Sequence, residues 1–121
     1  MINSTVAEIS AALAAGDISS VEITQAYLDR NATLNGELNA FITVCEDSAL
    51  LAAKAADEAR ANGLDSPLLG IPLAHKDIFC TKDILTTCGS RMLHNFVSPY
   101  NAAVVERFND AGTVLLGKTN M

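Results

Sequence analysis

The second half of the chain constrains the fold most, because its pattern is strand, loop, helix and strand in turn. Residues 71–79 are a short apolar run with charges near its end, and residues 113–116 are a second run of β-branched residues and leucines. A helix is expected between them, with Asn101 as its N-cap and Gly112 at its end, and Gly117 begins a turn after the second strand. Strands joined through a helix pair in parallel, so the sequence predicts a βαβ unit within a mixed α/β sheet.

The first half of the chain is expected to be mainly helical. Two pairs of residues have capping-box spacing: Thr5 with Glu8, and Ser19 with Glu22. The first pair opens a helix that Gly16 ends, and the second opens a helix that runs to about Asn31.

Between the second and third helices the chain changes direction. Residues 34–36 predict a turn, and residues 40–44 predict a strand or an extended link. A third helix is expected from Asp47 or Ser48 to Ala61. Its alanines lie on several faces, which predicts close packing against a neighbouring element.

These patterns indicate the α/β fold class. Residues 1–69 form a helical N-terminal layer, and residues 70–121 form the start of an α/β core within the same domain. A chain of 121 residues suffices for one small domain but not for a large enzyme with an enclosed pocket.

Composition excludes several classes of function. Hydrophobic residues make up 50% of the chain, as in globular proteins, and the formal net charge of -6 repels phosphate backbones, so this segment is not expected to bind nucleic acid directly. The three cysteines lack the spacing of a disulfide framework, which favours free thiols in a reducing cytoplasm. No secretory signal is expected from the N-terminal residues, and no stretch approaches the ~20 apolar residues of a membrane span.

Lys76 is the candidate catalytic residue. It lies inside an apolar strand, where lost hydration favours the neutral form of a lysine and allows it to act as a general base. The alternative is that Lys76 extends into solvent at the strand end and pairs with Asp77, since lysine is rarely buried. The residue pattern alone favours this alternative.

Residues 112–119 match the P-loop pattern G-x-x-x-x-G-K-[ST]. A phosphate-binding loop follows a strand and opens a helix, so that backbone amides point at the phosphate. Here a helix comes first, and the four middle residues favour a strand. Nucleotide binding by this string is therefore not expected.

Neither the cysteines nor the histidines form a convincing site. Cys80, Cys88, His75 and His94 match no common zinc spacing, so no metal site is expected. Buried structural thiols are also commoner than cysteine nucleophiles.

A small, hydroxyl-rich segment lies between the two predicted strands. It contains Thr86, Thr87, Gly89 and Ser90. The segment is either a simple turn or one wall of a substrate pocket, and the sequence alone leaves both open.

The stretch from Leu69 to Met121 resembles the amidase-signature family. The string LGIPLAHKDIFCTK is similar to the first core strand of the family, where a G-[IV]-P-…-K-D pattern holds a catalytic lysine. The string LTTCGSRMLHNFVSPYNAAVVERFNDAG is similar to the loop and helix that follow, and TVLLGKTNM to the second strand. Within the family, the combination CTK…TTCGS…ML…NF…PY is most similar to the A subunits of tRNA-dependent amidotransferases.

This resemblance implies a Ser–cis-Ser–Lys mechanism with Lys76 as the base. A nucleophilic serine attacks the amide of glutamine and releases ammonia. The resemblance further implies a cytoplasmic heterotrimer with B and C subunits, in which the B subunit contacts tRNA and uses ATP and Mg²⁺ to form Gln-tRNA(Gln) or Asn-tRNA(Asn). No cofactor is expected in this chain itself.

Two features depart from the family pattern. The Gly/Ser-rich signature with both serines is not among these residues, so the chain is expected to be an inactive N-terminal part of the enzyme, and Ser90 is not its nucleophile. His75 stands where an apolar or aromatic residue is expected; strand alternation places it on the face opposite Lys76. The alternatives are a general amidase of the same family and a non-catalytic interaction module.

Overall fold

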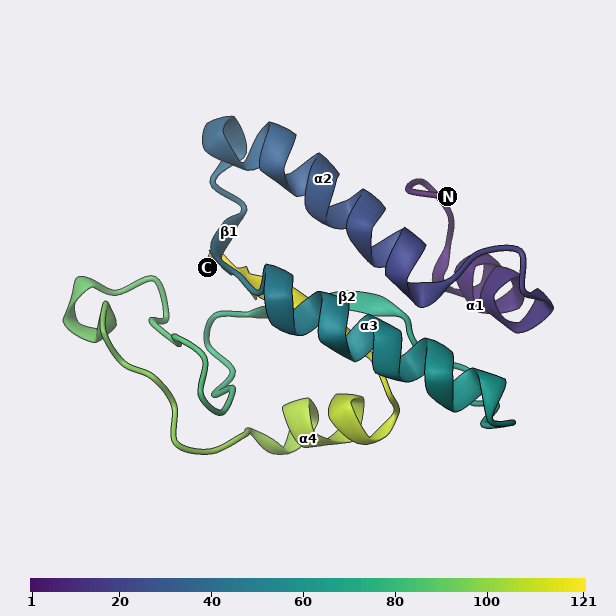
Figure 1. Cartoon of the computed structure of the whole chain (residues 1–121). Coiled ribbons are helices and arrows are strands. Elements are labelled where there is room, and N and C mark those ends of the chain that lie inside the picture. Colours follow the sequence, from purple (N-terminus) through teal and green to yellow (C-terminus); the bar gives the residue numbers. More distant parts are fainter.

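The computed structural model describes residues 1–121 and has a mixed α/β architecture (Figure 1). In chain order the elements are α1 (Val6–Ala15), α2 (Ser20–Leu38), β1 (Phe41–Val44), α3 (Glu46–Ala61), β2 (Pro72–Lys76), the 3-10 turn η1 (Arg91–Leu93), α4 (Ala103–Asp110) and β3 (Val114–Thr119). The sheet order is β1-β3-β2, with β1 antiparallel and β2 parallel to the central strand. The predicted fold class and the predicted parallel pair are therefore confirmed.

Both predicted capping boxes are present. The Thr5 hydroxyl accepts a hydrogen bond from the Glu8 amide, the Glu8 carboxylate accepts one from the Thr5 amide, and Ser19 and Glu22 repeat the arrangement at α2. Gly16 ends α1 in a left-handed conformation with φ of 78°. The hydrogen-bonded caps explain why the sequence identified these two helix starts correctly.

Helix α2 is longer than the sequence suggested. The expected turn at residues 34–36 is wrong, because the helix continues through Leu38 and ends at Asn39 with a φ of 51°. The Asn35 side chain bonds both backbone groups of Phe41, accepting from its amide at 2.8 Å and donating to its carbonyl at 3.1 Å. This asparagine therefore fixes the entry into β1 and does not form a turn.

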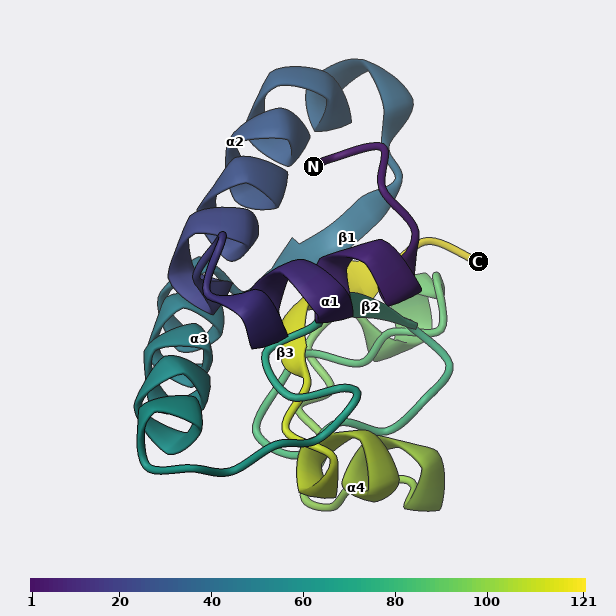
Figure 2. The same ribbon diagram turned by 90° about the vertical axis from the view of Figure 1, so that its right-hand side faces the viewer.

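Helices α2 and α3 pack together, and α3 also packs on β3. One core cluster comprises Ile9, Leu13, Ile23 and Ile71, and a second comprises Leu28, Ala49, Ala53 and Val114. The expectation that the α3 alanines serve close packing is confirmed, since Ala49, Ala53 and Ala56 are buried. Figures 1 and 2 show α2 and α4 on opposite sides of the strands. Residues 1–69 also contribute β1 to the sheet, in addition to the three helices.

The βαβ unit has different boundaries from those predicted. Strand β2 is shorter than residues 71–79, because the chain turns directly after Lys76 and the Phe79 amide bonds the Lys76 carbonyl at 3.0 Å. Strand β3 is longer than residues 113–116 and includes Gly117, so the turn expected there is wrong.

The start of α4 also differs. The N-cap is Ala102, and the expected cap residue, Asn101, instead accepts a hydrogen bond from the Lys82 amide at 2.7 Å. That bond ties the long connection between β2 and α4 to the start of the helix.

Candidate functional site

Lys76 lies at the carboxyl end of β2. It is paired in register with Thr119, near the carboxyl end of the parallel strand β3. Ligands of α/β proteins bind outside the carboxyl ends of parallel strands, so this edge is where a site is expected. The side chain of Lys76 is exposed, whereas His75 on one side and Asp77 on the other are buried. The expected burial of Lys76 is therefore wrong for this chain, and the solvent-facing position at a strand end, which was one part of the alternative, is confirmed.

The alternative interpretation proposed that Asp77 pairs with Lys76. This part of it is wrong, because Asp77 pairs with Lys118. The Lys118 ammonium lies 3.3 Å from Asp77 Oδ1, and both side chains are fully buried. Lys118 also donates to the Phe79 carbonyl at 2.9 Å and to the Thr86 hydroxyl at 3.1 Å. The buried lysine of the β2–β3 pair is thus Lys118.

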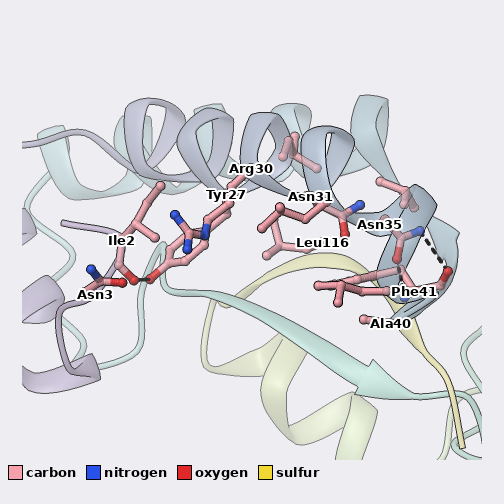
Figure 3. Close-up of a pocket in the computed structure, with 13 residues that line it drawn as sticks. Ile2, Asn3, Tyr27, Arg30, Asn31, Asn35, Ala40, Phe41 and Leu116 are labelled. Carbon is pink, nitrogen blue, oxygen red and sulfur yellow. Dashed lines mark hydrogen bonds between the residues drawn. The ribbon is translucent and has the colours of Figure 1, made fainter.

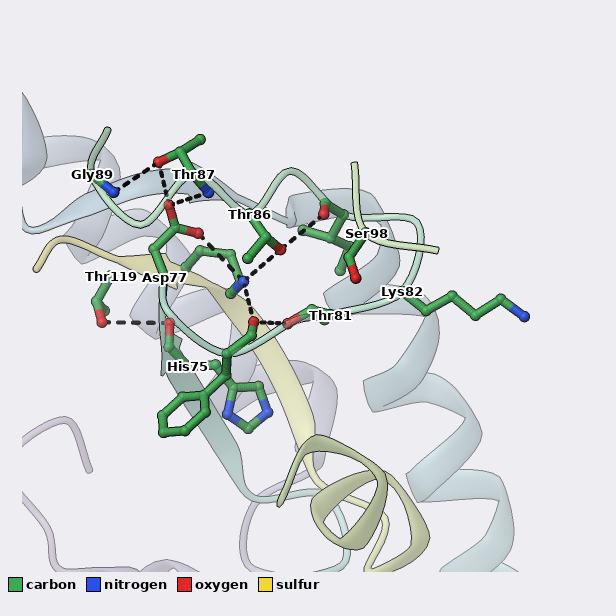
Figure 4. Close-up of polar contacts among 12 residues, drawn as sticks. His75, Asp77, Thr81, Lys82, Thr86, Thr87, Gly89, Ser98 and Thr119 are labelled. Carbon is green, nitrogen blue, oxygen red and sulfur yellow. Dashed lines mark hydrogen bonds and ion pairs between the residues drawn. The ribbon is translucent and has the colours of Figure 1, made fainter. Parts of the chain in front are cut away.

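Asp77 also holds the hydroxyl-rich segment, as the network of polar contacts in Figure 4 shows. Its Oδ2 accepts hydrogen bonds from the Thr87 amide at 2.8 Å and from the Thr87 hydroxyl. The Asp77 carbonyl accepts from the Cys88 amide at 3.1 Å, and the Thr87 hydroxyl accepts from the Gly89 amide, also at 3.1 Å. The segment is therefore bonded to Asp77, the residue that directly follows β2 and Lys76 in the chain.

His75 faces away from Lys76, toward α4, as strand alternation predicts. Its ring lies 5.6 Å from that of Phe108 with an interplanar angle of 56°. Burial lowers the pKa of His75 below its usual 6.5, and the nearby positive charge of Lys118 lowers it further. His75 is therefore a neutral packing residue beside α4 and not part of the exposed edge.

The remaining candidate groups form no further site. All three cysteines are free thiols, and no group of three or more His, Cys, Asp or Glu side chains is placed to hold a metal ion. The string that matches a P-loop is the end of the α4 region followed by β3, and Lys118 within it is fully buried. None of the helices combines the length and the apolar character needed to cross a membrane.

An apolar pocket of about 320 Å³ lies between α2 and β1 (Figure 3). Tyr27, Leu34, Phe41 and Leu116 are among its lining residues, and Arg30 is the only charged one. The Tyr27 hydroxyl at this pocket donates to the Ile2 carbonyl at 3.0 Å, and Lys76 remains the candidate catalytic residue of the chain.

A protein-family model described as Amidase matches residues 22–121. The chain belongs to the amidase family. Two proteins named as the A subunit of glutamyl-tRNA(Gln) amidotransferase, from Methylobacillus flagellatus and Aromatoleum aromaticum, are 58% and 60% identical to it over all 121 residues. The chain spans 25% of the length of these curated relatives.

Solved structures of amidases have the same fold as this chain. The peptide amidase of Stenotrophomonas maltophilia superposes with a TM-score of 0.92 at 41% identity, over 98% of this chain and 25% of that one. A structure described as a vestigial complex related to an s-triazine catabolic enzyme gives a TM-score of 0.92 at 32% identity, over 98% of this chain and 26% of that one. The arrangement of helices and strands described above is therefore shared by amidase-family proteins.

Sequence reasoning missed Lys118 as a structural residue of this edge. Its position after the run Val114 to Gly117 indicated only a strand and a turn. Its partner Asp77 lies in another part of the chain, directly after β2, and no local spacing connects the two. The only available signal was that Lys76 and Lys118 each lie near the end of an apolar run, and that Asp77 directly follows Lys76.

Proposed function

We propose that a full-length protein containing these residues is the glutamine-hydrolysing component, the A subunit, of a tRNA-dependent amidotransferase. The observation that carries this proposal is the 56–60% identity to proteins of that name over the whole chain, compared with 41% to the peptide amidase. The protein releases ammonia from glutamine in the cytoplasm. Partner B and C subunits complete the enzyme, and the B subunit binds tRNA and uses ATP and Mg²⁺ to form the amide.

Lys76 is the general base of this proposed reaction. Its support is its match to the lysine of the G-[IV]-P-…-K-D pattern and its position at the carboxyl edge of the parallel pair. The serines that the family resemblance implies belong to a Gly/Ser-rich stretch that is not among these residues. We therefore expect the 121 residues alone to hydrolyse no amide, because a base without its nucleophile has nothing to activate.

The test is Lys76→Ala in the full-length protein, assembled with its B and C subunits. Removal of a general base lowers kcat by ~100- to 10,000-fold. The matched control is Lys82→Ala, since Lys82 is exposed and extends away from the polar network (Figure 4). Glutamine hydrolysis at near-normal turnover in the Lys76 variant would refute the assignment.

A second candidate is an amidase that acts on small amides without partner subunits. The similarity to the peptide amidase, which reaches a TM-score of 0.92, favours it. Both reactions would be measured on the same full-length protein, as ammonia release from glutamine and from a C-terminally amidated dipeptide. Hydrolysis of the dipeptide amide alone, without stimulation by B and C subunits, would favour the general amidase.

A further inference from the structure

The buried ion pair between Asp77 and Lys118 needs an explanation beyond stability. Both side chains are fully buried, and Asp77 Oδ1 contacts the ammonium at 3.3 Å without receiving a hydrogen bond. Replacing such a pair by apolar residues is often neutral or even stabilising, because the two charges lose their hydration. The pair is therefore weak evidence for a role in stability, and its contacts with neighbouring segments indicate another role.

The pair joins three parts of the chain at one point. Lys118 belongs to β3, Asp77 follows β2 directly, and both extend bonds to the segment 86–90 (Figure 4). Lys118 reaches that segment through the Thr86 hydroxyl, and Asp77 reaches it through the amide and the hydroxyl of Thr87. The segment contributes no strand of its own to the sheet. Its Thr86 amide bonds the Phe96 carbonyl at 2.9 Å, and the Asp77 and Lys118 side chains, with the Cys88 amide bond to the Asp77 carbonyl, tie it to the ends of β2 and β3.

The backbone of the segment adopts a conformation that has to be held. Cys88 and Gly89 both have left-handed φ angles, 53° and 65°, and the first is unfavourable for a residue with a side chain. A Cβ added at Gly89 would lie 3.0 Å from the Met121 side chain. The segment is therefore packed against the residues that follow β3, at the same carboxyl edge as Lys76.

We infer that the Asp77–Lys118 pair is a positioning device that fixes residues 86–90 as one wall of the amide-binding site beside Lys76. Asp77, Lys118 and Thr87 are then positioning residues that act through the wall and do not touch the reacting atoms. This inference rests on the proposed amide hydrolysis at Lys76. The inference assigns a role to Lys118, which lies in the string that matches a P-loop. It also assigns a role to residues 86–90, for which the sequence did not decide between a simple turn and a pocket wall.

The test compares Thr87→Val with Thr87→Ser in the full-length protein with its B and C subunits. Valine keeps the shape of threonine but removes the hydroxyl between Asp77 and Gly89, whereas serine keeps the hydroxyl. The matched control is Thr24→Val, because Thr24 is equally buried and its hydroxyl has no hydrogen-bond partner. The readouts are kcat and KM per folded molecule, for ammonia release from glutamine and from an amidated dipeptide.

We expect Thr87→Val to lower kcat/KM by on the order of 10- to 100-fold, the loss typical of a misplaced active-site wall. Thr87→Ser should stay within a few-fold of the unsubstituted protein, and Thr24→Val should match it. If Thr87→Val does not fold, Gly89→Ala decides, because it strains the segment at Gly89, the exposed residue among 86–90, without touching the ion pair; the same loss is expected of it.

Normal kcat and KM in folded Thr87→Val, or in Gly89→Ala where that variant decides, would overturn the inference and leave the proposed function standing. Equal impairment of Thr87→Val and Thr87→Ser would also overturn it, since packing and not the hydroxyl would then matter. An unsubstituted protein that hydrolyses neither amide would contradict the proposed function and this inference together.

Discussion

The ammonium group of Lys118 depends on three oxygen atoms for its stability in the interior. They belong to Asp77, Phe79 and Thr86 and lie 2.9 to 3.3 Å away. Lysine is among the residues least often found fully buried, and burying a charge is costly unless partners replace its lost hydration. The same holds for the Asp77 carboxylate, so removal of either charge leaves the other without compensation.

Lys118→Met is therefore expected to destabilise the chain by about 3 to 5 kcal/mol, the usual cost of breaking a buried ion pair from one side. Urea unfolding of the full-length protein measures the effect. Lys54→Met is the matched control, since Lys54 is exposed on α3 and its loss should change stability by less than about 0.5 kcal/mol. Combining Lys118→Met with Asp77→Asn should recover part of the loss. Equal effects of Lys118→Met and Lys54→Met would show that the pair is unimportant.

His75 makes stability depend on pH. Its pKa is lowered in the folded state by burial and by Lys118, so the unfolded chain binds a proton more readily than the folded one. The contribution of neutral His75 to the free energy of unfolding is fully present above pH 6.5, the pKa of His75 in the unfolded chain. Stability decreases as the pH falls below that value toward the lower pKa of the folded state. The slope cannot exceed about 1.4 kcal/mol per pH unit for one group.

Thermal unfolding between pH 7.5 and pH 5 tests this dependence. His75→Phe should make the melting temperature less sensitive to pH in that range, because phenylalanine can pack against Phe108 without a titrating group. His94→Gln is the control, since the only other histidine is exposed and should leave the dependence unchanged. Identical pH dependence in the unsubstituted chain and the His75 variant would contradict the assignment.

Local patterns predicted the elements whose determinants are local. The capping boxes at Thr5 and Ser19 lie within a single turn of helix, and they were found correctly. Elements fixed by distant partners were not. Asn101 caps no helix, because its side chain accepts a hydrogen bond from the Lys82 amide, which lies 19 residues away. The buried lysine at the candidate site was missed for the same reason, since Lys118 is defined by Asp77, which is distant in the sequence. The end of α2 was also misplaced, although its contact is local, since Asn35 bonds Phe41 only six residues further on.

Strand β3 depends on Gly117 because glycine has no side chain. A glycine after an apolar run predicts a turn, but here it lies inside β3, where β1 approaches closely. A Cβ at this position would collide with the Thr43 carbonyl oxygen and would lie 3.0 Å from the Phe41 ring. The irregular register between Phe41 and Thr43 accompanies this approach.

Gly117→Ala is expected to destabilise the chain by at least about 1 to 3 kcal/mol, because the added methyl group meets rigid backbone. Gly36→Ala is the matched control and should have the opposite sign. Gly36 lies inside α2 with nothing near its Cβ position, so alanine there should stabilise by about 0.5 to 1 kcal/mol. Urea unfolding of both variants measures the difference. A neutral Gly117→Ala would show that β1 can move away from β3.

On the scale of the whole molecule, the chain has a small core and an open sheet. Only 22 of the 121 residues are buried, so little apolar surface offsets the conformational entropy of folding. The sheet has three strands, with β1 and β2 at its edges, and Ile42 and Val44 of β1 are exposed at 37% and 41%. Parallel strands are normally covered on both faces, and an exposed apolar edge pairs readily with other chains.

We therefore expect the isolated 121-residue chain to be marginally stable, to bind a hydrophobic dye and to self-associate, with the helices before Gly63 as its best-protected part. Size-exclusion chromatography with light scattering, thermal unfolding and amide hydrogen exchange measure these properties. Ile42→Lys should reduce association, because a charge on an edge strand discourages pairing. Leu51→Lys is the control, since Leu51 is 70% exposed on α3, away from the edge. A monodisperse monomer with a sharp transition at high temperature would show that the chain is an autonomous domain, and a non-catalytic interaction module would then explain it better.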